Sequence, residues 1–167
     1  YPTTFSEVEA RDYSALSPLT DDADFVAITQ PDVIAPVADH NQGEISPVVQ
    51  CRTTTLFVNE PWLSGTSVVV AYEGTRTDVA LEIADRYATQ AKLPLVVIAP
   101  KGLDCTTIEA QHTVHFSAED WNDAAIAALC RQHDARLLVL GTASHGHWQA
   151  VARLLIETTP CSILQVV

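Results

Sequence analysis

The segment from residue 134 to residue 167 has the arrangement best suited to binding a phosphate. A predicted strand at residues 136–140 ends at Gly141, and a predicted helix at residues 148–157 follows after a short loop. In open α/β sheets such a turn often binds phosphate, because glycine lets backbone N–H groups approach the anion and the helix dipole favours negative charge. This loop is therefore the first candidate for function, although it is short and poor in glycine.

The same loop contains two histidines, His145 and His147. Imidazole can ligate a metal or transfer a proton near neutral pH, and Glu73 could approach from another loop. A hydrolase or metal enzyme built on these three residues is one hypothesis, and it requires a stoichiometric metal. An isolated histidine pair is a weak metal signal, and no G-x-S-x-G motif supports a catalytic triad. We therefore expect exposed loop histidines, no metal site and no enzyme.

Composition limits the classes of partner. The chain has 167 residues, is 47% hydrophobic, and carries a net charge of −12 with a sequence pI of about 4.6. Nucleic acids and anionic membranes attract basic surfaces, so neither is an expected partner. The four cysteines are far apart and form no Cys-x-x-Cys motif, which favours a reducing cytoplasm.

Apolar periodicity predicts the elements that must position these loops. Continuous apolar runs indicate buried strands at residues 67–71, 95–99, 113–116, 137–140 and 163–167. An amphipathic helix is predicted at residues 78–92, capped by Thr77 or Asp78, with Val79, Ile83, Tyr87 and Ala91 at helical spacing. A second helix is predicted from a Ser117 cap to about residue 133. This order predicts an α/β fold, with an open, mainly parallel sheet flanked by helices. We interpret Trp121 and Trp148 as packing or interface residues.

The first sixty residues show a weaker copy of the later pattern. Residues 5–28 are similar in order to residues 116–140, and residues 51–58 are similar to residues 161–167. We interpret residues 1–60 as the back half of a first repeat, 61–65 as a linker and 66–167 as a complete second repeat. Chance similarity between two α/β segments is the alternative. Because the chain starts at Tyr1 and has no methionine, we expect an excerpt of a longer protein or a processed start.

The second repeat resembles the universal stress protein family. Its V-A-Y-E-G-T segment at residues 70–75 is similar to the opening strand and turn of that family, and D-A-R-L-L-V-L-G at residues 134–141 is similar to a later strand. Residues 150–164 align without gaps to the closing segment of the family. The resemblance covers most of residues 66–167 and implies a Rossmann-like fold of the adenine nucleotide alpha hydrolase type.

Nucleotide-binding members of that family carry G-x2-G-x9-G-[ST] after the fourth strand. Here Gly141 is present, Ser144 stands in place of the second glycine, and Gln149 and Ala150 stand in place of the closing Gly-[ST]. Glu73 replaces the aspartate of the first turn. Since the donors that make a phosphate nest are missing, the resemblance implies a degenerate site and no cofactor. The alternative is a modified cleft for ATP or AMP, lined by Glu73, Gly74, Thr75, Ile98, Gly141, Thr142, Ser144 and Gly146.

The resemblance also implies a role and partners. We expect a non-catalytic, cytoplasmic regulatory domain. Its final strands, at residues 54–58 and 162–167, are expected to pair within the chain as a pseudo-dimer or with a second copy in a homodimer. Such domains also occur as cytosolic tails of cation/proton antiporters, which would place a membrane transporter domain in the same polypeptide.

Overall fold

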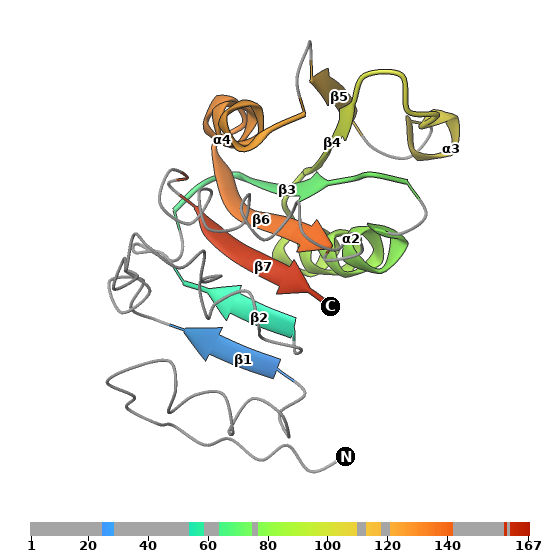
Figure 1. Ribbon diagram of the computed structural model, residues 1–167. Helices are drawn as coiled ribbons and strands as arrows, with labels where there is room; N and C mark the ends of the chain where they lie inside the picture. Colours follow the sequence, from blue (N-terminus) through green and yellow to red (C-terminus); the bar gives the residue numbers. More distant parts are fainter. Residues whose placement is uncertain are drawn as a thin grey trace, which may run out of the picture.

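The computed structural model describes residues 25–28, 54–58, 64–74, 77–109, 113–117, 121–141, 159 and 161–167. They contain three helices: α2 (Asp78–Ala91), α3 (Thr106–Glu109) and α4 (Asp123–Gln132). The strands are β1 (Phe25–Ile28), β2 (Thr54–Phe57), β3 (Ser67–Ala71), β4 (Leu95–Pro100), β5 (Thr113–Ser117), β6 (Ala135–Gly141) and β7 (Ser162–Val166). They form one sheet in the order β1-β2-β7-β6-β3-β4-β5 (Figure 1).

The sheet is parallel except at one junction. Strands β7, β6, β3, β4 and β5 run parallel to one another, and β1 runs parallel to β2. The antiparallel junction lies between β2 and β7, where Leu56 is opposite Leu164. The predicted α/β class with an open, mainly parallel sheet is therefore confirmed. The strands at residues 54–57 and 162–166 do pair within this chain, whereas association of two copies stays a prediction.

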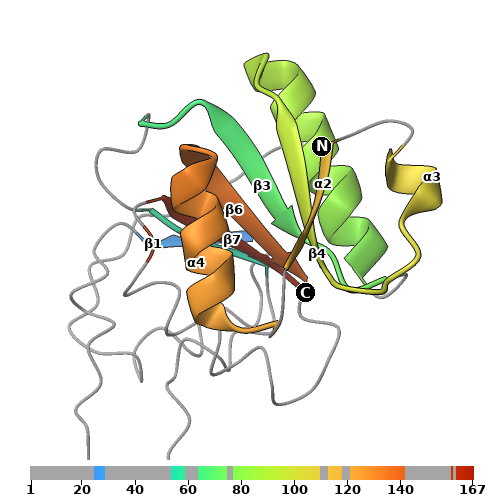
Figure 2. The same ribbon diagram turned by 90° about the horizontal axis from the view of Figure 1, so that it is seen from above.

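Helices cover both faces of the parallel strands. Helix α4 packs on one face, and α2 and α3 lie on the other (Figures 1 and 2). Strand β3 is in the middle of the covered region, and all five of its residues are buried. Alternate side chains of each strand point to opposite faces, which is why the strands are apolar throughout rather than alternately polar. None of the described helices has the length and apolar character needed to cross a membrane.

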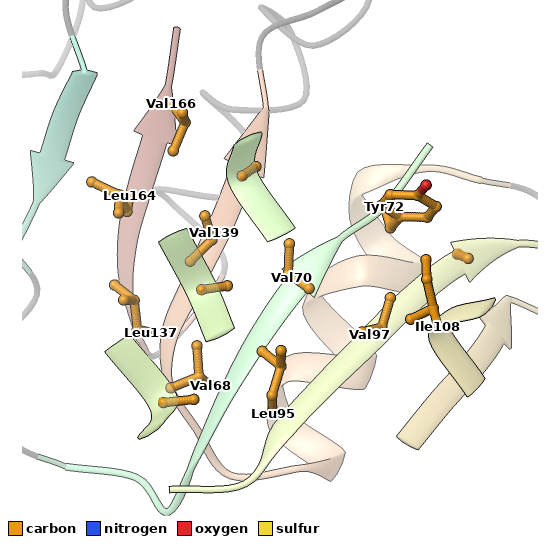
Figure 3. Packing of buried hydrophobic residues seen from close by; sticks show 14 of the residues in the cluster. Val68, Val70, Tyr72, Leu95, Val97, Ile108, Leu137, Val139, Leu164 and Val166 are labelled. Atoms are coloured by element: carbon orange, nitrogen blue, oxygen red, sulfur yellow. The ribbon is translucent and has the colours of Figure 1, made fainter. Parts of the chain in front are cut away.

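The core on the α2 face is built mainly from branched aliphatic side chains. Val68 and Val70 of β3 lie between Val97 of β4 and Val139 of β6, and Leu164 of β7 extends the layer (Figure 3). β-Branched side chains suit a pleated sheet because their restricted χ1 angle costs little there. At the carboxyl end of the layer, Tyr72 lies near Ile108 of α3 (Figure 3).

Helix α2 buries a different stripe from the one predicted. Its buried residues are Ala80, Ala84 and Ala88, whereas Val79 is 58% exposed. Ile83 and Tyr87 are only partly buried at the margins. Small side chains let the helix approach the sheet closely, which larger residues at the same positions would prevent. The periodicity therefore predicted the helix correctly but assigned its central buried face to the wrong residues.

Helix α4 begins later than predicted. Ser117, the expected cap, is the last residue of β5, and Asn122 occupies the N-cap. The Asn122 Oδ1 atom accepts a hydrogen bond from the Ala125 N–H at 3.0 Å, as N-cap side chains commonly do. Helix α3 was not predicted. The Asp104 carboxylate starts it by accepting from Thr106 N and Oγ1 at 3.1 and 2.8 Å, and these bonds lower the pKa of Asp104.

Most of the predicted first repeat lies outside the described residues. Only β1 and β2 represent it, and the predicted helix at residues 148–157 is also outside. Strands β1 and β2 pair in parallel in the way that β6 and β7 do. The division at residues 61–65 stays a prediction.

The chain enters β3 through a close contact with the turn before β6. Thr66 N donates to Asp134 O at 2.7 Å, and Arg136 Nε donates to Gly65 O at 3.1 Å. Gly65 has φ +94°, and a Cβ atom there would lie 2.6 Å from Arg136 N. Glycine is therefore required at this position by its conformation and by the neighbouring backbone.

We predict that Gly65→Ala destabilises the protein by about 2 kcal/mol or more, because it adds a backbone clash to a left-handed φ that costs about 1–2 kcal/mol. Gly102→Ala is the matched control, since Gly102 has φ +89° and no atom of the described residues lies within 4 Å of the place that its Cβ would occupy. Urea unfolding should show the larger loss for Gly65→Ala. Equal losses would show that the contact with Arg136 is unimportant.

Candidate functional site

The carboxyl ends of β3, β4 and β6 meet at one edge of the sheet. Ala71 is the register partner of both Ile98 in β4 and Leu140 in β6, so the loops after these strands leave the sheet side by side. In parallel α/β sheets this edge is where ligands bind. The structure places Glu73, Gly74 and Gly141 at this edge. The side chain of Ile98 is fully buried in the core. Thr75, Thr142, Ser144, Gly146 and both loop histidines lie outside the described residues.

A buried hydroxyl holds the turn after β3. Thr77 Oγ1 accepts from Glu73 N at 3.0 Å and donates to Gly74 O at 2.8 Å. Thr77 occupies the N-cap of α2 as predicted, but its side chain makes no capping hydrogen bond. Its hydroxyl forms hydrogen bonds with the backbone of the preceding turn instead. Gly74 has φ +94°, a conformation that glycine adopts without strain.

The same threonine packs against the end of β6. A Cβ atom at Gly141 would lie 3.0 Å from Thr77 Cγ2 and 3.4 Å from Ala80 Cβ. The glycine that ends the predicted phosphate strand therefore has a packing role, since it makes room for the start of α2. This explains the glycine without a ligand.

Glu73 is hydrogen-bonded from across the site. The Trp121 Nε1–H group donates to Glu73 Oε1. Trp121 directly precedes the Asn122 cap of α4 and packs, half-buried, against the core on the α4 face. Sequence reasoning assigned this tryptophan to packing and missed its contact with the site. The available signal was the indole N–H, because a partly buried tryptophan usually needs an acceptor.

A second hydrogen bond joins the end of β3 to the start of α2. Tyr72 OH donates to Asp78 Oδ1 at 3.0 Å. Burial raises the pKa of Tyr72 to about 12, and the hydrogen bond to Asp78 and its negative charge add to the effect. The phenol is therefore neutral at physiological pH and is no general base.

The described part of the site has few means of binding a metal or an anion. No group of three or more His, Cys, Asp or Glu side chains suited to a metal occurs among the described residues. Glu73 and Asp78 place two carboxylates near the turn, where they repel a phosphate. A carboxylate at this position suits a ligand that donates hydrogen bonds, such as an amino or hydroxyl group.

The structure is similar to solved universal stress proteins. A universal stress protein from Archaeoglobus fulgidus DSM 4304 aligns with a TM-score of 0.66 at 14% identity, over 92% of this chain and 64% of that one. A putative universal stress protein from Pseudomonas aeruginosa UCBPP-PA14 aligns with a TM-score of 0.60 at 18% identity, over 87% of this chain and 64% of that one. This chain thus spans less than two thirds of either protein.

A third structure, the Archaeoglobus fulgidus universal stress protein in complex with dAMP, aligns with a TM-score of 0.47 at 18% identity, over 61% of this chain and 98% of that one. No protein-family model matches the chain, and no curated protein matches it.

Replacing Thr77 tests the buried hydroxyl. We predict that Thr77→Val destabilises the protein by about 1–3 kcal/mol, because the Glu73 N–H loses its partner in a partly buried site. Thr77→Ser keeps the hydroxyl and loses only a methyl group, so its cost should be smaller, about 1 kcal/mol. Chemical denaturation of both variants is the measurement. A valine variant as stable as the wild type, beside a destabilised serine variant, would assign the role of Thr77 to packing alone.

The raised pKa of Tyr72 predicts how the stability of the protein depends on pH. Its pKa is raised from 10.0 to about 12 in the folded protein, so the folded state holds this proton more tightly than the unfolded state. The resulting stabilisation is complete below pH 10 and is lost as the pH rises toward 12. The unfolding free energy of the wild type should fall more steeply over that window than that of Tyr72→Phe. If the unfolding free energies of the two proteins fall in parallel as the pH rises, the raised pKa of Tyr72 is contradicted.

Proposed function

The chain has the universal stress protein fold, and from that premise we propose that it is a non-catalytic regulatory domain whose nucleotide site has degenerated. The observation that carries the proposal is that Glu73 is already hydrogen-bonded within the protein. Its carboxylate accepts from the Trp121 indole, and its backbone N–H donates to Thr77. A ligand approaching this residue would have to replace internal hydrogen bonds, and breaking them without full compensation costs affinity.

Charge supports the same proposal. Glu73 and Asp78 bracket the turn after β3, and the whole chain has a net charge of −12. A nucleotide carries its own negative phosphates, so long-range electrostatics oppose its approach. Asp78 also lies in the first turn of α2, where it already interacts favourably with the positive end of the helix dipole.

The sequence after Gly141 adds a third argument. Ser144 and Ala150 stand where the nucleotide-binding pattern has a glycine and a hydroxyl residue. Alanine supplies no side-chain donor to a phosphate, and any residue other than glycine restricts the backbone conformations that a phosphate nest needs.

The alternative function is nucleotide binding in a modified cleft. It is favoured by the meeting of the β3, β4 and β6 ends at one edge, together with the absence of a side chain at Gly74. The carboxylate of Glu73 could accept a hydrogen bond from an adenine amino group or a ribose hydroxyl. For this to happen, Trp121 must release the carboxylate.

The more specific roles depend on the resemblance. The regulatory domain would act through protein contacts, as a homodimer or as the cytosolic tail of a cation/proton antiporter. Membrane-spanning segments encoded in the same reading frame would support the antiporter role. Sedimentation equilibrium of the isolated chain would test the homodimer.

Calorimetric titration with ATP and AMP tests the proposed function. We predict no binding tighter than about 1 mM, a free energy of about −4 kcal/mol. Micromolar binding of either nucleotide would contradict the degenerate site. Elemental analysis of the purified protein should also show no stoichiometric metal, and a bound metal would revive the metal-enzyme hypothesis.

Two variants separate the proposal from the alternative. Trp121→Phe keeps an aromatic ring but cannot donate to Glu73, and Glu73→Gln keeps the size of the side chain but removes its charge. If the site is degenerate, neither change creates nucleotide binding. If the cleft is functional, Trp121→Phe should tighten binding because Glu73 is released. Circular dichroism of both variants checks that they are folded.

A further inference from the structure

Two polar side chains are buried at the antiparallel junction where β2 meets β7 (Figure 1). Thr55 of β2 is opposite Gln165 of β7 in the register of the two strands. Their exposed fractions are only 0% and 5%. A buried polar pair at this place requires a physical reason, because an apolar pair would be buried there without losing hydration.

Both polar residues lie on the face of the sheet against which α4 packs. Phe57 and Ile163, each two positions away along its own strand, belong to the apolar cluster that includes residues of α4. Side chains two positions apart in a strand point to the same face. Phe57 is opposite Ile163, so this face of the junction has a polar pair directly beside an apolar pair.

A hydrogen bond to the side-chain oxygen does not explain Gln165. The Gln165 Oε1 atom is buried and accepts no hydrogen bond from any residue that the structure describes. A buried acceptor without a donor lowers stability, and an aliphatic side chain of similar shape avoids that loss. The presence of Gln165 is therefore better explained by the alternative pairings that it disfavours.

The pattern of pairs distinguishes the observed register from its neighbours. A shift of β2 by one residue would turn Phe57 to the opposite face of the sheet. A shift by two residues keeps the faces but changes the pairs: in one direction Gln165 would lie opposite Phe57, and in the other Thr55 would lie opposite Ile163. Each of these shifts places a polar side chain against a large apolar one, which the observed register avoids.

We propose that Thr55 and Gln165 specify the register in which β2 pairs with β7. A single buried polar residue fixes the register of some coiled coils in the same way, at a cost in stability. Both are positioning residues in this proposal, since they act through the alignment of the two strands. The proposal is independent of the function proposed above.

The register at this junction aligns two parts of the sheet. Strands β1 and β2 are joined to the other five described strands through β7, in the order β1-β2-β7-β6. A shift by two residues would move β2 along β7 by about 7 Å, since an antiparallel strand rises about 3.4 Å per residue. The free edge of β7 thus fits one kind of partner: an antiparallel strand with a polar residue opposite Gln165 and an apolar residue opposite Ile163.

Disulfide trapping in the full chain measures the register. Three variants combine Leu56→Cys with a second cysteine in β7: Leu164→Cys reports the observed register, and Ser162→Cys and Val166→Cys report shifts by two residues in opposite directions. Diagonal neighbours are about 7–8 Å apart, whereas a disulfide needs a Cα separation of about 4.4–6.8 Å. The proteins are refolded from urea, oxidised and mapped by mass spectrometry, which separates the intended links from any that the native cysteines form.

Substitutions of the polar pair then test its role. Thr55→Val should raise the yield of the link between positions 56 and 162 by about fivefold, the effect of one cross-strand pair, because the shifted strand would place Thr53 opposite Gln165 and an aliphatic side chain opposite Ile163. Gln165→Leu should raise the link between positions 56 and 166 by a similar factor, because an aliphatic side chain would then lie opposite Phe57. Each variant is the matched control for the other, since each permits a shift in one direction only.

Stability separates this role from ordinary hydrogen bonding. Because Gln165 Oε1 has no donor within the described residues, Gln165→Leu should unfold at a urea concentration no lower than that of the wild type. Unchanged yields of the shifted links in both variants would overturn the proposal. A lower unfolding midpoint for Gln165→Leu with the register retained would also overturn it, since it would show that a bound water or an internal donor satisfies the amide.

Discussion

The burial of β3 on both faces is the constraint on which the rest of the structure depends. Val68, Val69, Val70 and Ala71 are all 0% exposed, which is possible only if helices cover both sides of the sheet. On one side α2 meets the sheet through alanines, so its first residues come close to β6. That approach requires glycine at position 141 and places Thr77 where its hydroxyl can hold the turn after β3. The packing of the core thus determines the geometry of the candidate site.

The polar groups at that site are bonded to the protein itself. Within the described residues, Glu73 interacts with Trp121 and Thr77, and Tyr72 interacts with Asp78. Partly buried polar groups that already have partners gain little from an additional ligand. The edge of the sheet keeps the outline of a ligand-binding fold, while its carboxylates and its internal hydrogen bonds are the basis of the proposal that the nucleotide site has degenerated.

Sequence patterns predicted the strands well because their signal is local. Residues 67–71 are apolar in a continuous run, and the structure has β3 at those residues. The buried face of α2 could not be predicted in the same way, because large side chains such as Val79 dominate a hydrophobic pattern while close packing selects Ala80 and Ala84. The hydrogen bond between Trp121 and Glu73 joins residues 48 positions apart. No local pattern predicts a contact between residues so far apart in the chain. The glycine at position 141 was recognised, but its packing role required the position of Thr77.

The place of β7 in the sheet has a consequence for how the protein assembles. It follows the other described strands in the chain, yet it lies inside the sheet between β6 and β2. Synthesis proceeds from the amino terminus at about 5–20 residues per second. Strands β2 and β6 therefore each have one unpaired edge until β7 has been made. Unpaired edges are templates for association with other chains. A nascent chain of this protein is consequently most exposed to aggregation just before its last described strand leaves the ribosome, and chaperone binding at that stage would have its greatest effect.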